Sequence, residues 1–334
     1  RLSLSLSVAV SLSLCLSFCL SVSLSVCPSL SDCLSVCLSV SLSVCLSVSL
    51  SHSLSSLTLS SPYMDTGICI SIEMTRTIMK VVFAALLTSS STTPCSGSCA
   101  ITPNNVGHVN IPSIWISVGD RAFWSCYSLS SITIPDNVTS IGEGAFHLCS
   151  SLSAITISNG VTSIGVGAFH SCSSLSSITI PPSVTTIGNG AFASCYTLSA
   201  ITIPDGVTSI GEGAFHDCSS LSSISIPNIA VINKSTFHNC SSLSIVNIPD
   251  TVTNIAYSAF SYCSNLSTIN IPDHVTSIGE GAFAHCTSLS TFNMPKNVTS
   301  IGDRAFHSCS NLSSITISDS VTSIGVGLFV QCSK

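Results

Sequence analysis

The sequence predicts a mostly β solenoid of about ten stacked units of 23 residues, preceded by a low-complexity segment. Phenylalanine recurs every 23 residues, with a single interval of 22 between Phe215 and Phe237, and a cysteine follows each phenylalanine by three residues. A unit this short cannot bury its apolar face alone and must stack on its neighbours. The marker phenylalanines are Phe123, Phe146, Phe169, Phe192, Phe215, Phe237, Phe260, Phe283, Phe306 and Phe329.

Each unit contains two short extended segments, as residues 129–149 illustrate. Ile132 and Ile134 are β-branched and alternate with a polar residue, which predicts a strand with both isoleucines facing inward. Pro135 ends this strand because proline has no N–H to donate to a sheet. Residues 138–141 predict a second, shorter extended segment.

A turn and a buried ring complete the unit. Gly142 and Gly144 permit backbone angles that other residues rarely adopt. Residues 145–149 are long enough for one helical turn at most, and we expect them to place Phe146 in the core on the side opposite the first strand.

Two units depart from this consensus. A degenerate first unit begins near Val106, and it has Trp115 at the position that Val138 occupies in the next unit. The one-residue deletion falls near Asn228, between Pro227 and Ile229, in a predicted loop where a deletion costs least.

The repeat resembles the BspA-type branch of the leucine-rich repeats. The resemblance rests on the segments Leu-x-x-Ile-x-Ile-Pro and Ile-Gly-x-Gly-Ala-Phe-x-x-Cys, as in residues 198–218, and covers residues 106–332. It implies a leucine-rich-repeat solenoid, which we place at 101–334, and a surface or secreted protein involved in adhesion and partner binding. The family motif contains no catalytic residue, so none is carried over.

The front of the chain differs in kind from the repeats. Residues 1–60 alternate Ser with Leu, Val and Cys, and Ser-Val-Cys-Leu at 35–38 recurs at 43–46. A translated TCTG repeat would read Ser-Val-Cys-Leu, so we interpret this segment as translated simple-sequence DNA and not as a domain. The chain also begins with Arg1, which is consistent with a fragment or an upstream-extended gene.

A secretory signal is predicted at residues 74–100. A short cationic start at 74–80 precedes the apolar run 81–87, and small polar residues follow. An alternative is an apolar patch in a Ser/Thr-rich linker. The signal would place the mature protein outside the cell or on its surface.

Composition argues against several functions. The chain has 8 basic and 14 acidic residues, a net charge of −6, and no basic stripe for nucleic acid. Membrane contact is not required by the repeat region. The sequence lacks a nucleophile elbow, His-Glu-x-x-His, Cys-x-x-Cys, a P-loop and Gly-x-Gly-x-x-Gly, so we predict a non-enzymatic protein without a cofactor.

Histidine follows phenylalanine directly in five units, which raises the question of metal binding. Neighbouring units pair His147 with His170 and His216 with His238. Two histidines without a carboxylate or third ligand are a weak signal, so we predict an exposed loop column and no metal. The five are His147, His170, His216, His238 and His307.

The chain has 19 cysteines, and ten of them form the column three residues after phenylalanine. A column that repeats in every unit is best explained as a small buried apolar filler, so we predict reduced thiols there. Cys95 and Cys99 are the better candidates for a disulfide, although they would close a tight loop.

N-glycosylation is predicted if the protein is secreted by a eukaryote. Six Asn-x-Ser/Thr sequons occur, and Asn239 is the poorest because Cys240 occupies its middle position. Asn233 begins another of the six. The preferred acceptors are Asn137, Asn265, Asn297 and Asn311.

The outward position of the first strand is the expected recognition face for an unknown protein or glycan. Thr or Ser fills this column except for Asn247, Asn270 and Asn293, and Ile245 places an apolar residue beside them. Stacked asparagines could instead bond only to one another. Two further readings stay open: a structural matrix or surface-binding β-solenoid that uses hydroxyl arrays, and a non-functional gene fragment.

Overall fold

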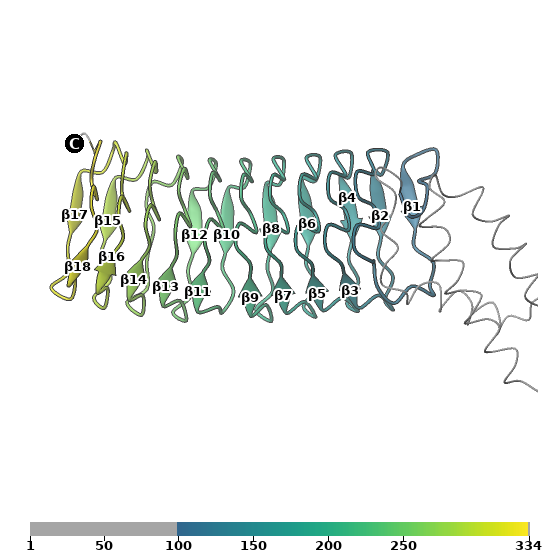
Figure 1. Cartoon of the computed structure of the whole chain (residues 1–334), viewed down its shortest axis with the longest axis horizontal. Coiled ribbons are helices and arrows are strands. Elements are labelled where there is room, and N and C mark those ends of the chain that lie inside the picture. Colours follow the sequence, from purple (N-terminus) through teal and green to yellow (C-terminus); the bar gives the residue numbers. More distant parts are fainter. Residues whose placement is uncertain (1–98, 333–334) are drawn as a thin grey trace, which may run out of the picture. The chain divides into compact units, whose positions relative to one another are not determined.

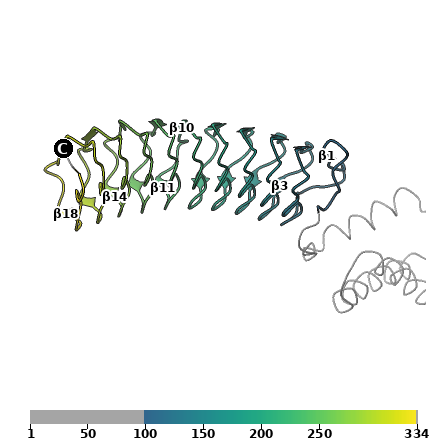
Figure 2. The same cartoon turned by 90° about the horizontal axis from the view of Figure 1, so that it is seen from above.

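The computed structural model describes residues 99–332, which form a parallel β-solenoid (Figure 1). The segment 1–60 and residues 74–98 of the predicted signal lie outside the described residues. Figure 2 shows the rungs stacked one behind another. Within the described range the regular elements are all strands, and no helix there is long and apolar enough to cross a membrane.

The strands form two columns along the stack, one for each extended segment of the repeat. The first column consists of β1 (His108–Asn110), β2 (Ser131–Thr133), β4 (Ala154–Thr156), β6 (Ser177–Thr179), β8 (Ala200–Thr202), β10 (Ser223–Ser225), β12 (Ile245–Asn247), β15 (Thr291–Asn293) and β17 (Ser314–Thr316). The second consists of β3 (Ser140–Ile141), β5 (Ser163–Ile164), β7 (Thr186–Ile187), β9 (Ser209–Ile210), β11 (Val231–Ile232), β13 (Asn254–Ile255), β14 (Ser277–Ile278), β16 (Ser300–Ile301) and β18 (Ser323–Ile324).

Neighbouring rungs pair in parallel with equivalent repeat positions side by side. Val109 of β1 lies opposite Ile132 of β2, so the degenerate first unit is a genuine rung. Val118 extends the second column by a bridge to Ile141. Since every side chain faces the same position of the next rung, each repeat column becomes a continuous row of one residue type.

The core consists of these rows, as the sequence predicts. Ile132 and Ile134 are both buried, whereas Thr133 between them is exposed. Nine phenylalanines from Phe123 to Phe306 are at most 1% exposed, and consecutive rings stack with centroids 5.2–5.6 Å apart. Each unit therefore depends on its neighbours for the burial of its aromatic ring.

The two turn positions require glycine for different physical reasons. Gly144 has a φ of 55°, in the left-handed region. Gly142 has an ordinary φ, but a Cβ there would lie 2.7 Å from the Asp120 nitrogen of the preceding rung. The expectation of unusual backbone angles is thus correct for Gly144, whereas Gly142 is required by close approach of two backbones.

The shortened unit coincides with a break in the second strand column, whereas the first column is unpaired there and also between β4 and β6. The second column forms a four-stranded sheet that ends at β9 and a five-stranded sheet that begins at β11, and the first column has no pairing between β8 and β10. Asn233 partly compensates, because its side-chain Nδ2 donates to the Ile210 carbonyl at 2.7 Å. The deletion does lie in a loop, but its effect extends to the adjacent strands.

The disulfide prediction is wrong in its pairing. Cys99 bonds to Cys126, the first member of the cysteine column, and not to Cys95. This bond, together with the hydrogen bond from Ala100 N–H to the Ala122 carbonyl, ties residues 99–100 onto the first described rung. The other described cysteines are free thiols, and those from Cys149 to Cys309 are buried, as predicted.

Candidate functional site

The predicted recognition residues lie on the outward face of the first column. Ile245 and Asn247 belong to β12, with Ile245 58% exposed, and Asn293 belongs to β15. Asn270 is also exposed, but its rung forms no ladder with β12 or β15. The side chains of this face therefore follow one repeat position from rung to rung, although the backbones of its strands are not hydrogen-bonded at every step.

The three asparagines do not form a hydrogen-bonded row among the described residues. Asn247 Nδ2 donates to Ser225 Oγ in the preceding rung at 3.1 Å. No bond joins Asn247 to Asn270 or Asn270 to Asn293 in residues 99–332. The Asn270 and Asn293 amides are thus free for solvent or a partner, whereas the Asn247 amide is bonded to the preceding rung, and mutual stacking does not explain the three.

The second threonine column uses its hydroxyls inside the fold. Thr139 Oγ1 donates to the Ile116 carbonyl of the preceding rung at 3.0 Å. Its counterparts make the same bond at 3.1–3.3 Å, so their protons are not available to an external surface. These counterparts are Thr162, Thr185, Thr208, Thr253, Thr276, Thr299 and Thr322.

The sequons differ in how free their amides are. Asn137 is exposed but donates to the Trp115 carbonyl. Asn233 and Asn239 are half-buried, and each donates to the preceding rung. The exposed acceptors whose side chains make no hydrogen bond within the described residues are Asn265, Asn297 and Asn311.

The histidine column is not an exposed loop column, which corrects the sequence prediction. Its rings are half-buried and stack between rungs. His147 stacks on Trp124 at 3.8 Å and lies 4.6 Å from His170. A second row runs from His216 and His238 through Tyr262 and His285 to His307, at 4.1–5.4 Å between centroids. We call these two rows the turn ladder.

Sequence reasoning missed the turn ladder because it uses two repeat positions. His147 and His238 directly follow phenylalanine, whereas Tyr262 and His285 lie one residue later. A search of both positions for ring-bearing residues would have found the row.

Burial shifts the titration of the turn ladder. Burial, with smaller contributions from His170 and Arg121, lowers the pKa of His147 to about 4. Burial first, and the neighbouring His216 second, lower the pKa of His170 and of His238. These rings are therefore neutral at physiological pH. Both burial and the positive charge of neighbouring groups disfavour the protonated form.

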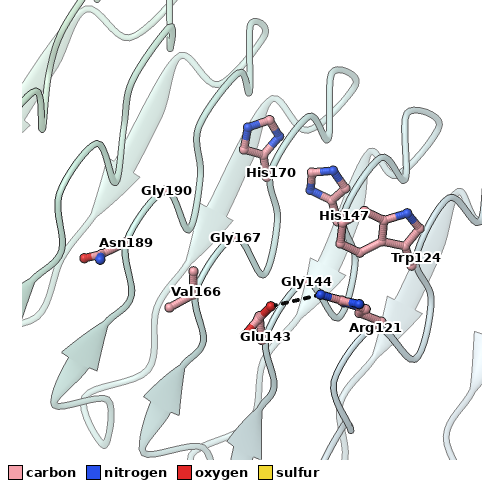
Figure 3. A pocket seen from close by; sticks show the side chains of 10 residues that line it. All are labelled: Arg121, Trp124, Glu143, Gly144, His147, Val166, Gly167, His170, Asn189 and Gly190. Atoms are coloured by element: carbon pink, nitrogen blue, oxygen red, sulfur yellow. Dashed lines mark hydrogen bonds and ion pairs between the residues drawn. The ribbon is translucent and has the colours of Figure 1, made fainter. Parts of the chain in front are cut away.

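An open groove lies beside the start of the turn ladder (Figure 3). Arg121 is 3.3 Å from Glu143 and lies over the Trp124 ring at 5.2 Å. His147 and His170 line one side of the groove, and Figure 3 shows that their rings are offset from the ion pair. The arrangement offers aromatic and charged contact surface, and its ion pair is solvent-exposed.

A carboxylate accompanies the second histidine pair. His216 Nδ1 lies 3.2 Å from Asp217 Oδ2, and the His216 and His238 rings stack at 4.7 Å. One ligand-type atom from each of His216, Asp217 and His238 lies within 4.8 Å of the other two. The sequence argument that no third ligand accompanies the histidines is wrong for this pair.

Comparisons with known proteins agree on the repeat type. The profile described as BspA type leucine rich repeat region matches residues 100–222 and 208–334, with six copies. Curated proteins give no match.

Several solved structures are similar to the chain. A leucine rich repeat protein from T. pallidum is 33% identical, with 48% of this chain and 78% of that chain covered and a TM-score of 0.47. A leucine-rich repeat protein from Bacteroides ovatus is 29% identical, with 67% and 76% covered and a TM-score of 0.44. A leucine rich cell surface protein from Faecalibacterium prausnitzii is 29% identical, with 68% and 86% covered and a TM-score of 0.35.

The family assignment rests on the sequence profile together with the fold. The profile spans most of the chain, and the same residues form in-register rungs with the repeat's Leu, Ile, Phe and Cys in the core. The chain belongs to the BspA-type leucine-rich repeat family.

Proposed function

We propose that the chain is a non-enzymatic, secreted or cell-surface protein that binds a protein or glycan partner through the outward face of its first strand column. Membership of the BspA-type family supports this proposal through the adhesive, surface-exposed role that the resemblance implies. The site centres on Ile245, Asn247, Asn270 and Asn293.

The observation that carries the proposal is the exposure of Ile245 beside unpaired amides. Ile245 is 58% exposed on β12, opposite Ser223 of β10. Solitary exposed isoleucines are unremarkable. Here, however, Asn270 and Asn293 occupy the position of Asn247 in the next two rungs, and their amides have no hydrogen-bond partner within residues 99–332; such mixed apolar and polar surface is typical of partner sites.

The hydroxyl-array alternative receives less support. A hydroxyl surface for a matrix or crystal needs free O–H groups in register, and the Thr139-type column donates its protons within the fold. The Thr133-type column stays exposed, but asparagine occupies four of its positions, Asn110, Asn247, Asn270 and Asn293. As for the gene-fragment alternative, core rows that are continuous from Val109 to Leu312 favour a maintained fold.

Secretion would make three exposed sequons accessible to glycosylation. Asn265, Asn297 and Asn311 have free, exposed amides, so we propose them as acceptors. Asn137 would lose its bond to the Trp115 carbonyl on modification.

The test is a double substitution that restores the column consensus. Glycan arrays and capture with cell-surface extracts would first supply a partner for the wild-type chain. Ile245→Ser combined with Asn270→Thr should weaken its binding at least about tenfold, because the exposed apolar anchor and one amide are both lost. Biolayer interferometry measures the change.

The control is Thr179→Ser with Thr202→Ser on β6 and β8 of the same face, away from the asparagines. It should leave affinity unchanged. Equal affinity of the wild type and the Ile245/Asn270 variant would rule out these residues as the site.

A further inference from the structure

The junction between the rungs of β9 and β11 contains a cluster of three potential metal ligands. His216 and Asp217 follow Phe215 in one rung, and His238 follows Phe237 in the next. The His216 and His238 rings lie nearly parallel, with an interplanar angle of 5° and 4.7 Å between centroids. Ligand-type atoms of all three residues lie within 4.8 Å of one another.

The Asp217 carboxylate is held in place by its neighbours. Its Oδ1 accepts a hydrogen bond from Asn239 Nδ2 at 2.8 Å, while Oδ2 lies 3.2 Å from His216 Nδ1. The Asp217 backbone N–H also donates to the His238 carbonyl at 2.9 Å, which fixes the two rungs at this point. An outer amide that orients a ligating carboxylate is a recurrent feature of metal sites.

One ring has an unused nitrogen. His238 Nδ1 is fully buried and finds no hydrogen-bond partner among the described residues. A buried nitrogen without a partner costs free energy, and a bound cation would satisfy a histidine with a free lone pair.

The other stacked histidine pair provides an internal comparison. His147 and His170 lie 4.6 Å apart, almost as close as His216 and His238. The residues that follow them are Leu148 and Ser171, so this pair has no carboxylate at the position of Asp217. The aspartate therefore distinguishes a potential metal site from a purely stacked pair.

We propose that His216, Asp217 and His238 bind one divalent transition-metal ion, with Zn²⁺ as the best match to two imidazoles and a carboxylate. Three protein ligands leave one coordination position for water or for a group from a partner. Imidazole nitrogen also suits Cu²⁺ and Ni²⁺, which bind such sites at comparable or higher affinity, so selectivity is not built into the ligand set.

Binding requires a small rearrangement of the rings. Zinc bonds of about 2.0–2.1 Å in a tetrahedral site place ligand atoms roughly 3.3–3.4 Å apart. The ligand atoms here are up to 4.8 Å apart and the rings are parallel, so both imidazoles must tilt toward a common point. Both histidines belong to turns and are half-buried.

An ion at this position would join two neighbouring rungs. Neither strand column is paired between the rung of β8 and β9 and the rung of β10 and β11. Backbone hydrogen bonds at the turn, such as Asp217 N–H to the His238 carbonyl at 2.9 Å, already join these rungs, and ligands from both sides would add a second link there. Metal binding should therefore stabilise this junction in proportion to the free ion concentration.

The test compares metal binding by the full chain and by matched variants. Asp217→Ser and His216→Ala introduce residues that the repeat already uses at these positions, in Ser194 and Ala193. After treatment with a chelator and a reductant, each protein is titrated with Co²⁺ and Zn²⁺, and bound metal is counted by mass spectrometry under native conditions. Because cysteines elsewhere in the chain also bind zinc, the measured quantity is the difference between wild type and variant.

The wild type should bind one more ion per chain than Asp217→Ser or His216→Ala, and the difference between the wild-type and variant Co²⁺ absorption spectra should lack a thiolate charge-transfer band. Asn239→Ser should weaken binding about tenfold to a hundredfold by releasing the carboxylate. The double variant His147→Ala/His170→Ala should bind like the wild type. Circular dichroism establishes that each variant is folded.

Equal stoichiometry in the wild type and in folded Asp217→Ser would overturn the proposal. Loss of the same ion from the His147→Ala/His170→Ala variant would also overturn it, because metal binding would then belong to histidine stacks in general. A zinc-dependent rise in the thermal midpoint of the wild type that is absent in Asp217→Ser would support the link between rungs.

Discussion

The cysteine of each unit is a hydrogen-bond donor as well as a small core residue. Cys149 Sγ donates to the Phe123 carbonyl at 2.9 Å, and later members of the column repeat this bond at 3.1–3.2 Å. Burial raises the pKa of the Cys149 thiol to about 12. A protonated thiol is required for this bond, so the buried environment that prevents ionisation also maintains the donor.

At the residue scale, sequence reasoning identified the thiols as buried and reduced but could not find their partners. The column position follows from periodicity alone. The carbonyl acceptor and the Cys99–Cys126 bond depend on how one rung lies over the next. The sequence of a single repeat does not predict this relative position of two rungs.

His147 should make the fold sensitive to acid. Its pKa is lowered from 6.5 to about 4, so the unfolded chain binds a proton in this interval that the folded chain excludes. His147 therefore does not lower the free energy of unfolding above pH 6.5. This free energy falls as the pH drops from 6.5 toward about 4. The loss should be on the order of 1 kcal/mol after allowance for solvent screening of this partly exposed ring.

The variant His147→Ala, which copies Ala193, should reduce this acid-dependent loss. The groups that face the ring are His170, Arg121 and Trp124, and all three stay in place in the variant. Urea denaturation at neutral pH and near pH 4 measures the difference. His274→Ala, an exposed histidine outside the turn ladder, is the control. An identical acid slope for wild type and His147→Ala would contradict the assignment.

At the element scale, each rung is held by close backbone contact at its second turn. A Cβ on Gly165 would lie 2.6 Å from the carbonyl carbon of Gly142, and one on Gly188 would meet Gly165 equally closely. The column has Asn233 in the shortened unit and Ala256 in the next one, so a side chain with a Cβ is tolerated at these two positions. Repeat spacing predicts the turn, but it cannot distinguish a glycine required by φ from one required by contact.

Gly165→Ala should destabilise the chain by about 1–3 kcal/mol, because the added methyl group forces two rungs apart. Gly119→Ala is the matched control, since no atom lies within 4 Å of a Cβ at the equivalent position of the first rung. Thermal and urea denaturation measure both variants. Equal stability of the two would show that the stack adapts as easily at Gly165 as at Ala256.

At the scale of the whole molecule, the sequence predicts the number and order of rungs because periodicity is a property of the entire array. It does not predict where the array is weakest. The 22-residue interval is visible between Phe215 and Phe237, yet the loss of pairing on both strand columns follows only from three-dimensional register. For the candidate metal site, the repeat predicts the approach of His216 and His238, but the approach of Asp217 to this pair follows only from the stacked rungs.

Phe215→Ala should reveal how far a local loss spreads along the stack. Removing a fully buried ring that stacks on Phe192 and Phe237 costs about 3–5 kcal/mol. In a one-dimensional array this loss acts first on adjacent rungs. The rung of Phe215 contains β9, which pairs with β7 but not with β11. Hydrogen exchange should therefore rise more in β7 and β5 than in β13 and β14, although both sides lose a stacking neighbour.

Phe260→Ala is the comparison, because β13 in its rung pairs on both sides. In this variant the rise in hydrogen exchange should be similar on the two sides. Uniform exchange across residues 99–332 in both variants would mean that the array unfolds as one cooperative unit, in which case the pairing break has no energetic consequence.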